Sequence, residues 1–391
     1  MSSSFGLAFE KKLISWAAFG LLFFLSSFLW APSRDGLQIV YLFSFFIPGL
    51  FLLALNLSRI NEYLNLATAF ALSYGAFSVI STSWGDKSFG FFILQWTVLA
   101  VWLLGLTIVL SRTGIDIKKY TLAFLIIGCL MIISSMLKYY LSDSASIDKR
   151  LWGWNVFRNP NEFGAMCGVI ALIAVVSAFQ SSSTKNVYRF YILGLIGFTG
   201  LMLSFSRSAL LAFFITSLTA LIIVRPPLKI WLPPILVILS LALVLIAFIG
   251  IPSAYLDGRG NAYSYRLIIW TTVLDFSTNN IFTGVGMSKN TNIGISGVDI
   301  FNHAHNAWLD TYYRTGLIGL LLICAHLVAV IKISLFNKET LPLFLWLCFG
   351  CLCSIFDGRC FFWEVGAKWF LYWIPAGLII ASATIKSHAQ T

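Results

Sequence analysis

Charged residues are scarce in this chain: they make up 10% of its 391 residues, whereas 59% are hydrophobic. Soluble domains carry roughly 25% charged residues, so a soluble fold of this composition would lack a polar surface. The apolar residues form continuous runs, which excludes the alternating strands of a transmembrane β-barrel. The sequence therefore predicts an all-α polytopic membrane protein.

The chain also lacks the common signatures of nucleotide and metal chemistry. It has no Walker loop, no GxSxG, no DxD pair and no concentrated group of acids for a divalent cation. The cysteine cluster "LCFGCLCS" is not followed by the second cysteine or histidine set that a zinc site needs. We therefore predict no metal site and no cofactor, and expect arginines to do the electrostatic work on any phosphate.

The formal net charge is +11, but no DNA-binding or RNA-binding signature accompanies it. In a membrane protein, lysines and arginines in loops set the topology and contact anionic lipid head groups. The basic residues are therefore interpreted as topology signals, with membrane lipids rather than nucleic acid as partners.

Apolar stretches separated by short polar loops predict about twelve transmembrane helices. Two of them form one apolar stretch of about 35 residues, which at 1.5 Å per residue suits two crossings rather than one. Arg207 is the only ionisable residue inside that stretch and marks the tip of the hairpin. The first span is interpreted as uncleaved. The predicted spans are 13–30, 37–56, 64–81, 89–110, 120–137, 164–180, 190–206, 208–224, 230–251, 315–335, 341–356 and 369–385.

Short loops on one side of these spans are rich in lysine and arginine, so both termini are predicted to be cytoplasmic. Two long loops, 141–163 and 252–313, then face outward. The second contains "SYRLIIWTTVLDF", which predicts a short amphipathic helix with Ser264 as its N-cap, and "GVGMSKN" is a turn signal. The predicted division is helices 1–9 in residues 1–251, a catalytic loop in residues 252–313 and helices 10–12 in residues 314–391.

Two arginines are not explained by topology. Arg207 lies at the hairpin tip, where an arginine costs a few kcal/mol unless it is paired or meets water. It is interpreted either as an anion ligand in a cavity or as an interfacial arginine that snorkels to head groups. A guanidinium suits phosphate because it offers a planar fork of donors and stays charged. Arg266, beside Trp270 on the predicted helix, is either a second anion ligand or part of a solvated face.

Two of the four histidines, His303 and His305, lie directly before the tenth predicted span. A helix is expected to start from Asn306, which places His305 near its N-terminus, where positive charge disfavours imidazolium. A neutral imidazole accepts a proton from a hydroxyl. Metal binding is an alternative, but the sequence shows no third ligand beside the two histidines. Gly316 and Gly319 are expected to let another helix approach closely.

These residues resemble the pattern of the O-antigen ligase family, within the wider O-antigen ligase/polymerase superfamily. The family motif is His, then Asn, Ser or Gln, nine residues, Gly, two residues, and Gly, Thr or Tyr. His305, Asn306, Gly316 and Gly319 match it in full. The segments "RNPNEFG" at 158–164 and "GVG" at 284–286 are similar to the family as well.

Arg207, in "SRS", and Arg266, in "YRLIIW", match the family's two arginines. The resemblance implies a GT-C-like, metal-independent glycosyltransferase. It would transfer a glycan from undecaprenyl diphosphate to lipid A–core oligosaccharide at the periplasmic face of the cell inner membrane, with the 252–313 loop in the periplasm. The arginines would bind the diphosphate and His305 would be the general base of one inverting displacement. The substrate-binding candidates are His303, Asn306, Arg158, Gly316 and Gly319.

Three alternatives stay open at this point. An O-antigen polymerase shares the donor but uses a second lipid-linked glycan as acceptor. A protein O-oligosaccharyltransferase would glycosylate serine or threonine of a periplasmic protein. A lipid-linked glycan transporter would instead carry its ionisable residues near the bilayer midplane, in broken helices.

Overall fold

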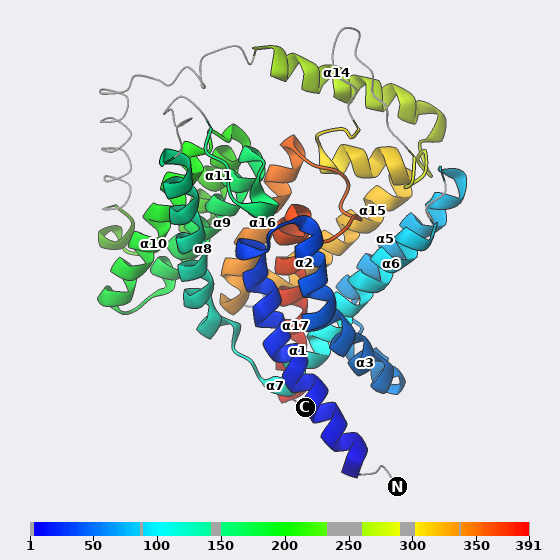
Figure 1. Ribbon diagram of the computed structural model, residues 1–391, viewed down its shortest axis with the longest axis horizontal. Coiled ribbons are helices and arrows are strands. Elements are labelled where there is room, and N and C mark those ends of the chain that lie inside the picture. Colours follow the sequence, from blue (N-terminus) through cyan, green and yellow to red (C-terminus); the bar gives the residue numbers. More distant parts are fainter. Residues whose placement is uncertain are drawn as a thin grey trace. The chain divides into compact units, whose positions relative to one another are not determined.

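The fold is described by a computed structural model, which covers residues 4–86, 89–141, 150–232, 260–289, 302–335 and 338–390. These residues form helices joined by turns, with no strand among them (Figure 1). Within the described residues, nine helical segments are long and apolar enough to cross a membrane, and two shorter apolar helices lie near the C-terminus. The chain is an all-α polytopic membrane protein, as the sequence predicts.

Each predicted span within the described residues contains a helix. The predicted span 230–251 lies almost entirely outside them, so the count of twelve stays a prediction. The α- and π-helices among the described residues are α1 (Ser4–Trp30), α2 (Arg34–Tyr41), η1 (Leu42–Phe46), α3 (Ile47–Leu55), α4 (Ile60–Tyr63), α5 (Leu66–Ser81), α6 (Phe89–Ala100), η4 (Val101–Gly105), α7 (Leu106–Thr113), α8 (Ile117–Tyr140), α9 (Pro160–Gln180), α10 (Thr184–Leu203), α11 (Arg207–Val224), α14 (Gly260–Ser277), α15 (Ala307–Leu335), α16 (Leu341–Phe356), η8 (Trp369–Trp373) and α17 (Ile374–Gln390).

The chain divides into two compact units, and each is described by itself. Unit 1 holds the N-terminal helices up to α7, most of α14, all of α15, and α17. Unit 2 holds α8 to α11 and the middle of α16. The residue ranges are Met1–Asp116, Tyr265–Phe344 and Ser354–Thr391 for unit 1, and Ile117–Ser264 and Leu345–Cys353 for unit 2.

The core of unit 1 is built on aromatic rings around Trp102, which is fully buried. Its indole N–H donates a 2.8 Å hydrogen bond to the carbonyl of Trp373. The rings of Tyr41 and Trp369 lie 6.5 and 6.3 Å from the Trp102 ring. Such ring pairs stabilise by about 0.5–1.5 kcal/mol beyond the burial of their area. Because η4 and η8 are π-helical turns, these contacts hold two locally widened helices together.

The core of unit 2 is built on small residues where α10 packs against α9. A Cβ at Gly197 would lie 2.7 Å from the backbone nitrogen of Ala171, and one at Gly200 would lie 2.8 Å from the sulfur of Cys167. Glycine therefore allows the two helices to approach closely, as is common within membranes. α10 ends at Leu203 and α11 begins at Arg207, so the predicted hairpin tip is confirmed.

Candidate functional site

The start of α15 carries the predicted catalytic histidine. The helix begins at Ala307, and the side chain of Asn306 caps it by accepting hydrogen bonds of 3.0 Å from the backbone N–H groups of Trp308 and Leu309. His305, directly before this cap, adopts the left-handed conformation with φ of 50°. Non-glycine residues rarely do so, and the conformation costs about 1–3 kcal/mol. The surrounding contacts must therefore hold His305 in place.

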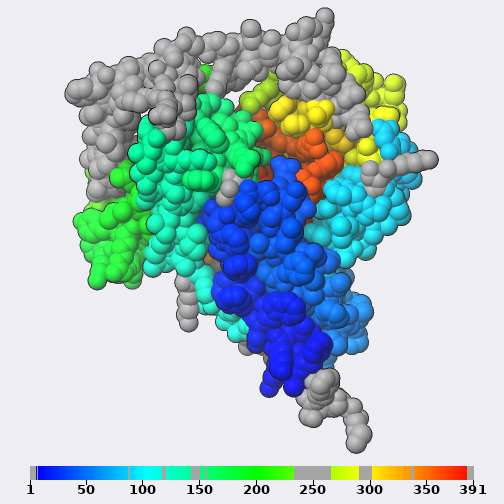
Figure 2. All heavy atoms as spheres, viewed as in Figure 1, coloured from blue at the N-terminus to red at the C-terminus, as the bar shows by residue number. Residues whose placement is uncertain are grey.

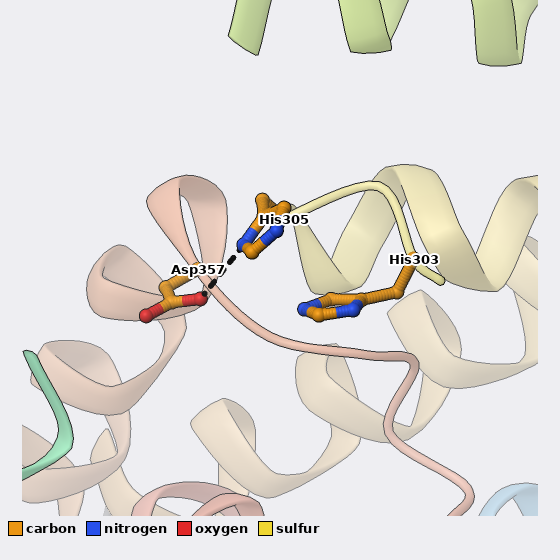
Figure 3. Close-up of side chains that lie close together, drawn as sticks. All are labelled: His303, His305 and Asp357. Carbon is orange, nitrogen blue, oxygen red and sulfur yellow. Dashed lines mark hydrogen bonds and ion pairs between the residues drawn. The ribbon is translucent and has the colours of Figure 1, made fainter. Parts of the chain in front are cut away.

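His305 lies against an acid that the sequence analysis did not single out (Figure 3). Its Nδ1 is 3.4 Å from Oδ1 of Asp357, and the two side chains are 30% and 21% exposed. The ring of His303 lies 4.1 Å from that of His305. One donor atom from each of the three residues lies within 4.8 Å of the other two. The expectation that the histidines have no third ligand nearby is therefore wrong, because Asp357 reaches them from the end of α16.

His303 is the more buried of the two histidines. Burial, and after it the neighbouring His305, lower its pKa from 6.5 to about 4. The side chain is therefore neutral at pH 7. Its Nδ1 is buried and has no hydrogen-bond partner among the described residues.

A buried ion pair below the histidines fixes their loop. Asp310 and Arg314 lie 2.9 Å apart, one turn from each other on α15, with side chains 1% and 4% exposed. The Asp310 carboxylate also accepts hydrogen bonds from the backbone N–H groups of Ala304 at 3.3 Å and Cys360 at 2.9 Å. Asp310 therefore ties the loop of His305 to the segment that follows Asp357.

Arg314 extends this network to the segment after α14. Its Nη1 donates to the carbonyls of Met287 at 2.9 Å and Lys289 at 3.0 Å. Gly284 and Gly286 have φ of 67° and 101°, which confirms the turn predicted from "GVGMSKN" over its described residues. A Cβ at Gly284 would lie 2.4 Å from the backbone of Arg314. Glycine at 284 thus lets this segment run directly along the start of α15.

Gly316 interrupts α15, with φ of 63° and ψ of −164°. Beyond the break, the N–H groups of Leu317 and Ile318 donate to the carbonyls of Ile281 and Phe282. A Cβ at Gly316 would lie 2.3 Å from Phe282 backbone atoms. The prediction that Gly316 allows a helix to approach is therefore wrong, because the turn after α14 occupies that position. Gly319 is buried, and its nearest side-chain neighbour is Thr315 of the same helix.

α14 packs on the histidine loop. The indole of Trp270 donates a 3.0 Å hydrogen bond to the carbonyl of Ala304, and buried residues of α14 pack against Ala304 and Tyr313. Arg266 is partly buried and lies one turn before Trp270, on the same helix face. The structure thus places Arg266 on the helix that covers the loop of His305.

Two predictions about α14 are wrong. The helix begins at Gly260, so Ser264 is inside it and is not its N-cap. It is also not amphipathic: Ile269 and Val273 are buried, while Leu267 and Leu274 are exposed. Large apolar side chains therefore point to both faces.

The loop between α16 and η8 supplies further charges beside the cluster. Lys368 Nζ donates a 2.7 Å hydrogen bond to the carbonyl of Asp357. Arg359 lies over the ring of Trp363, 5.0 Å from its centroid. Gly358 has φ of 105°, and a Cβ there would meet the side chain of Lys368. Sequence reasoning missed these residues, although their position between two predicted spans, on the same side as His305, was a usable signal.

Arg207 is the first residue of α11 in unit 2 and is partly buried. It lies two residues after Phe205, whose φ is 49°. Arg150 holds this turn, because its Nε donates a 2.9 Å hydrogen bond to the carbonyl of Ser204. Arg150 also bonds to the side chain of Asn161 in the first turn of α9. Arg158, which is exposed, precedes that helix. Unit 2 therefore brings the Arg207 turn and the "RNPNEFG" segment together, and sequence reasoning missed Arg150.

Comparison with known proteins supports one family. A family model described as O-antigen ligase matches residues 192–324, which include Arg207, Arg266 and His305. An O-antigen ligase of Pseudomonas aeruginosa (strain PAO1) is 24% identical over 315 residues, which cover 79% of this chain and 76% of that protein. Both comparisons support the O-antigen ligase family for this chain. That family suggests a glycosyltransferase-like enzyme.

The candidate site lies at one end of unit 1. Ion pairs of 2.8 Å between Arg34 and Glu364 and 3.1 Å between Lys289 and Asp86 join further loops there. Figure 2 shows the orange segment 357–366 against the yellow segment 302–309. The start of α1 and the end of α17 lie at the opposite end of the unit (Figure 1). Loops that the charge pattern assigns to one side of the membrane therefore meet around the histidines.

Proposed function

We propose that the chain is an O-antigen ligase that transfers a glycan from undecaprenyl diphosphate to lipid A–core oligosaccharide. The transfer takes place at the periplasmic face of the cell inner membrane, with both termini in the cytoplasm. Family membership supports the class of reaction. The observation that carries the proposal is the partly exposed pair of His305 and Asp357, at the end of unit 1 opposite its chain ends.

His305 acts as the general base. Its Nδ1–H donates to Asp357, which leaves the lone pair of Nε2 for the acceptor hydroxyl. The acceptor oxygen attacks the anomeric carbon as its proton passes to Nε2, and the bond from that carbon to the diphosphate breaks. Undecaprenyl diphosphate leaves with the bonding electrons, and the anomeric centre inverts. Base assistance of this kind contributes about 10²–10⁴-fold.

Arg207 and Arg266 stabilise the charge that develops on the diphosphate. Arginine forms paired hydrogen bonds to phosphate oxygens and stays cationic, so a GT-C-type transfer can proceed without a metal ion. The position of Arg266 on α14, beside the His305 loop, supports this role. Arg207 belongs to unit 2, and its contact with the same diphosphate is part of the proposal.

The other substrate-binding candidates differ in the support they receive. Arg158 is exposed and His303 lies beside the base, so both are candidates for contact with phosphate or acceptor. The side chain of Asn306 caps α15, and Gly316 and Gly319 are buried. These three residues are better supported as positioning residues. The proposed catalytic region accordingly extends beyond the 252–313 loop to residues 357–368.

The direct test is a transfer assay with purified protein, lipid-linked glycan and lipopolysaccharide core, in the presence of EDTA. His305→Ala should lower transfer by at least about 10²-fold, while His388→Ala is the matched control and should transfer normally. Donor supplied without the core acceptor should not be lengthened, which separates a ligase from a polymerase. Full activity of His305→Ala would contradict the role of His305 as general base. Loss of activity in EDTA would contradict a metal-independent mechanism.

A second test addresses the convergence of the two units. Cysteines placed at 207 and 305 should be joined by a short thiol cross-linker, and peptide mass spectrometry separates this product from links through the seven native cysteines. A pair at 225 and 305 is the control, since Arg225 ends the same helix as Arg207 begins. Equal cross-linking of the two pairs would contradict a shared pocket.

A further inference from the structure

We propose that His303, His305 and Asp357 bind a transition metal ion such as Zn²⁺, and that the bound ion inhibits glycan transfer. The three side chains point toward one another from the α15 loop and the end of α16 (Figure 3). The inference goes beyond the proposed function, which uses no metal. Binding of the ion follows from the geometry alone, and only the inhibition rests on the proposed function.

The spacing of the donor atoms suits a small divalent ion. Zinc ligands lie about 2.0–2.2 Å from the metal in a tetrahedral arrangement, which separates two ligand atoms by about 3.4 Å. Nδ1 of His305 and Oδ1 of Asp357 are 3.4 Å apart. The three donor atoms all lie within 4.8 Å of one another, so a modest rotation of the His303 ring completes the set.

The chemistry of the set also points to a metal of this class. Two imidazoles and one carboxylate are ligands that Zn²⁺, Co²⁺ and Ni²⁺ accept, whereas Mg²⁺ and Ca²⁺ prefer oxygen alone. Figure 3 shows one ring nitrogen of His303 pointing toward His305 and Asp357, so this nitrogen is the atom that would bind the ion. The 30% exposure of His305 leaves a route for the ion and room for water as a fourth ligand.

Neighbouring charges of both signs favour reversible binding of the ion. Asp310 lies close enough to His303 to favour a nearby cation, while Arg359 opposes one. Arg359 is on the same loop as Asp357. Three protein ligands beside an arginine suit an exchangeable ion better than a permanent structural one, whose sites are closed by four protein ligands.

The consequence for transfer follows from the lone pairs. A metal ion between His305 and Asp357 takes the place of the hydrogen bond that orients the imidazole. The ring then donates its Nδ1 lone pair to the metal and carries its proton on Nε2, so Nε2 has no lone pair with which to accept the acceptor proton. Occupancy should therefore lower the rate of transfer without unfolding the protein.

Binding is tested with Co²⁺ as an optical probe of the full chain, purified in detergent without a histidine tag. One equivalent of Co²⁺ should produce visible absorption bands, and Zn²⁺ should displace it. His303→Asn should weaken binding by more than about 10–100-fold, the loss typical for a residue that only supports a metal ligand. His388→Asn is the matched control and should bind as the parent does.

Two outcomes would overturn the site: no saturable Co²⁺ binding by the parent chain, or unchanged binding by a folded His303→Asn variant. Asp357→Asn is a second variant for the same titration, should His303→Asn fail to fold. The inhibition is tested in the transfer assay, where Zn²⁺ should lower the rate over the same concentrations that displace Co²⁺, and EDTA should restore it. Zinc binding that leaves transfer unchanged or faster would overturn the inhibition. A metal-free protein with no transfer would contradict the proposed function while leaving the Co²⁺ result intact.

Discussion

Two turns of the molecule share an unusual backbone but use it differently. In unit 2, Phe205 has φ of 49° and is followed by Ser206, the N-cap residue of α11, and by Arg207. In unit 1, His305 has φ of 50° and is followed by Asn306, which caps α15. The strained residue is a buried ring in the first turn and the candidate base itself in the second.

The two turns also differ in how they are held. Arg150 donates a hydrogen bond to the carbonyl of Ser204 in the unit 2 turn. The unit 1 turn is held by Asp310, which is fully buried and also bonds to Cys360 and Arg314. The arginine that supports the first turn is partly exposed, whereas the ion pair that supports the second turn is buried. The comparison predicts that the His305 turn depends more strongly on its supporting charge.

The largest effect is expected at that charge. Asp310→Ala leaves Arg314 buried without its partner and should destabilise the protein by about 3–5 kcal/mol. Arg150→Ala in unit 2 should cost only about 1 kcal/mol, since it removes hydrogen bonds at a partly exposed site. Thermal unfolding in detergent measures both. Equal losses for the two variants would break the contrast between the turns.

Replacing the strained residues themselves sharpens the comparison. Phe205→Gly removes strain but also a buried ring, whose loss typically costs about 3–5 kcal/mol, so a net loss of stability is expected. His305→Gly removes a partly exposed side chain and should leave stability unchanged or raise it by about 1 kcal/mol. Transfer should nevertheless fail in His305→Gly. A stabilised Phe205→Gly protein would show that the ring does not matter to the turn.

A third variant tests the break in α15. Gly316→Ala puts a Cβ against the backbone of Phe282 at a residue with φ of 63°, and should cost about 1–3 kcal/mol. The matched control is Gly90→Ala in α6, where a Cβ meets nothing within 4 Å and where alanine favours the helix. If Gly316→Ala unfolded at the same temperature as the parent protein, the contact between residue 316 and Phe282 would adjust to a side chain without loss of stability.

The smallest effect concerns the pH dependence of stability. The pKa of His303 is lowered by burial from 6.5 to about 4, so the unfolded chain binds more protons between these values. The free energy of unfolding should therefore fall as the pH falls from 6.5 toward 4. His303→Gln should show a shallower fall when both proteins are compared in EDTA. Parallel curves for the two proteins would contradict the assignment.

Much of the fold could be predicted because a membrane-spanning helix needs a long continuous run of apolar residues, which is visible in the sequence. The hairpin tip at Arg207 followed from the length of one run, and the start of α15 followed from Asn306 before an apolar stretch. The site was harder. Asp357 meets His305 only through tertiary contacts. The predicted spans put both residues on the same side of the membrane but do not indicate that they pair. The spacing of Gly316 and Gly319 is typical of helix packing, and the sequence does not distinguish that role from a break in the helix. A positive φ at one residue leaves the pattern of apolar residues unchanged.

The interruption at Gly316 affects how α15 responds to the thickness of the bilayer. Membranes vary in thickness, and a spanning segment responds by tilting. The part of α15 before the interruption is bonded to the turn at 284–286 and to the loop at Cys360, not only to the remainder of its own helix. We therefore expect tilting of the remainder to be absorbed at Gly316, so that the imidazole keeps its height when the lipid chains lengthen or shorten.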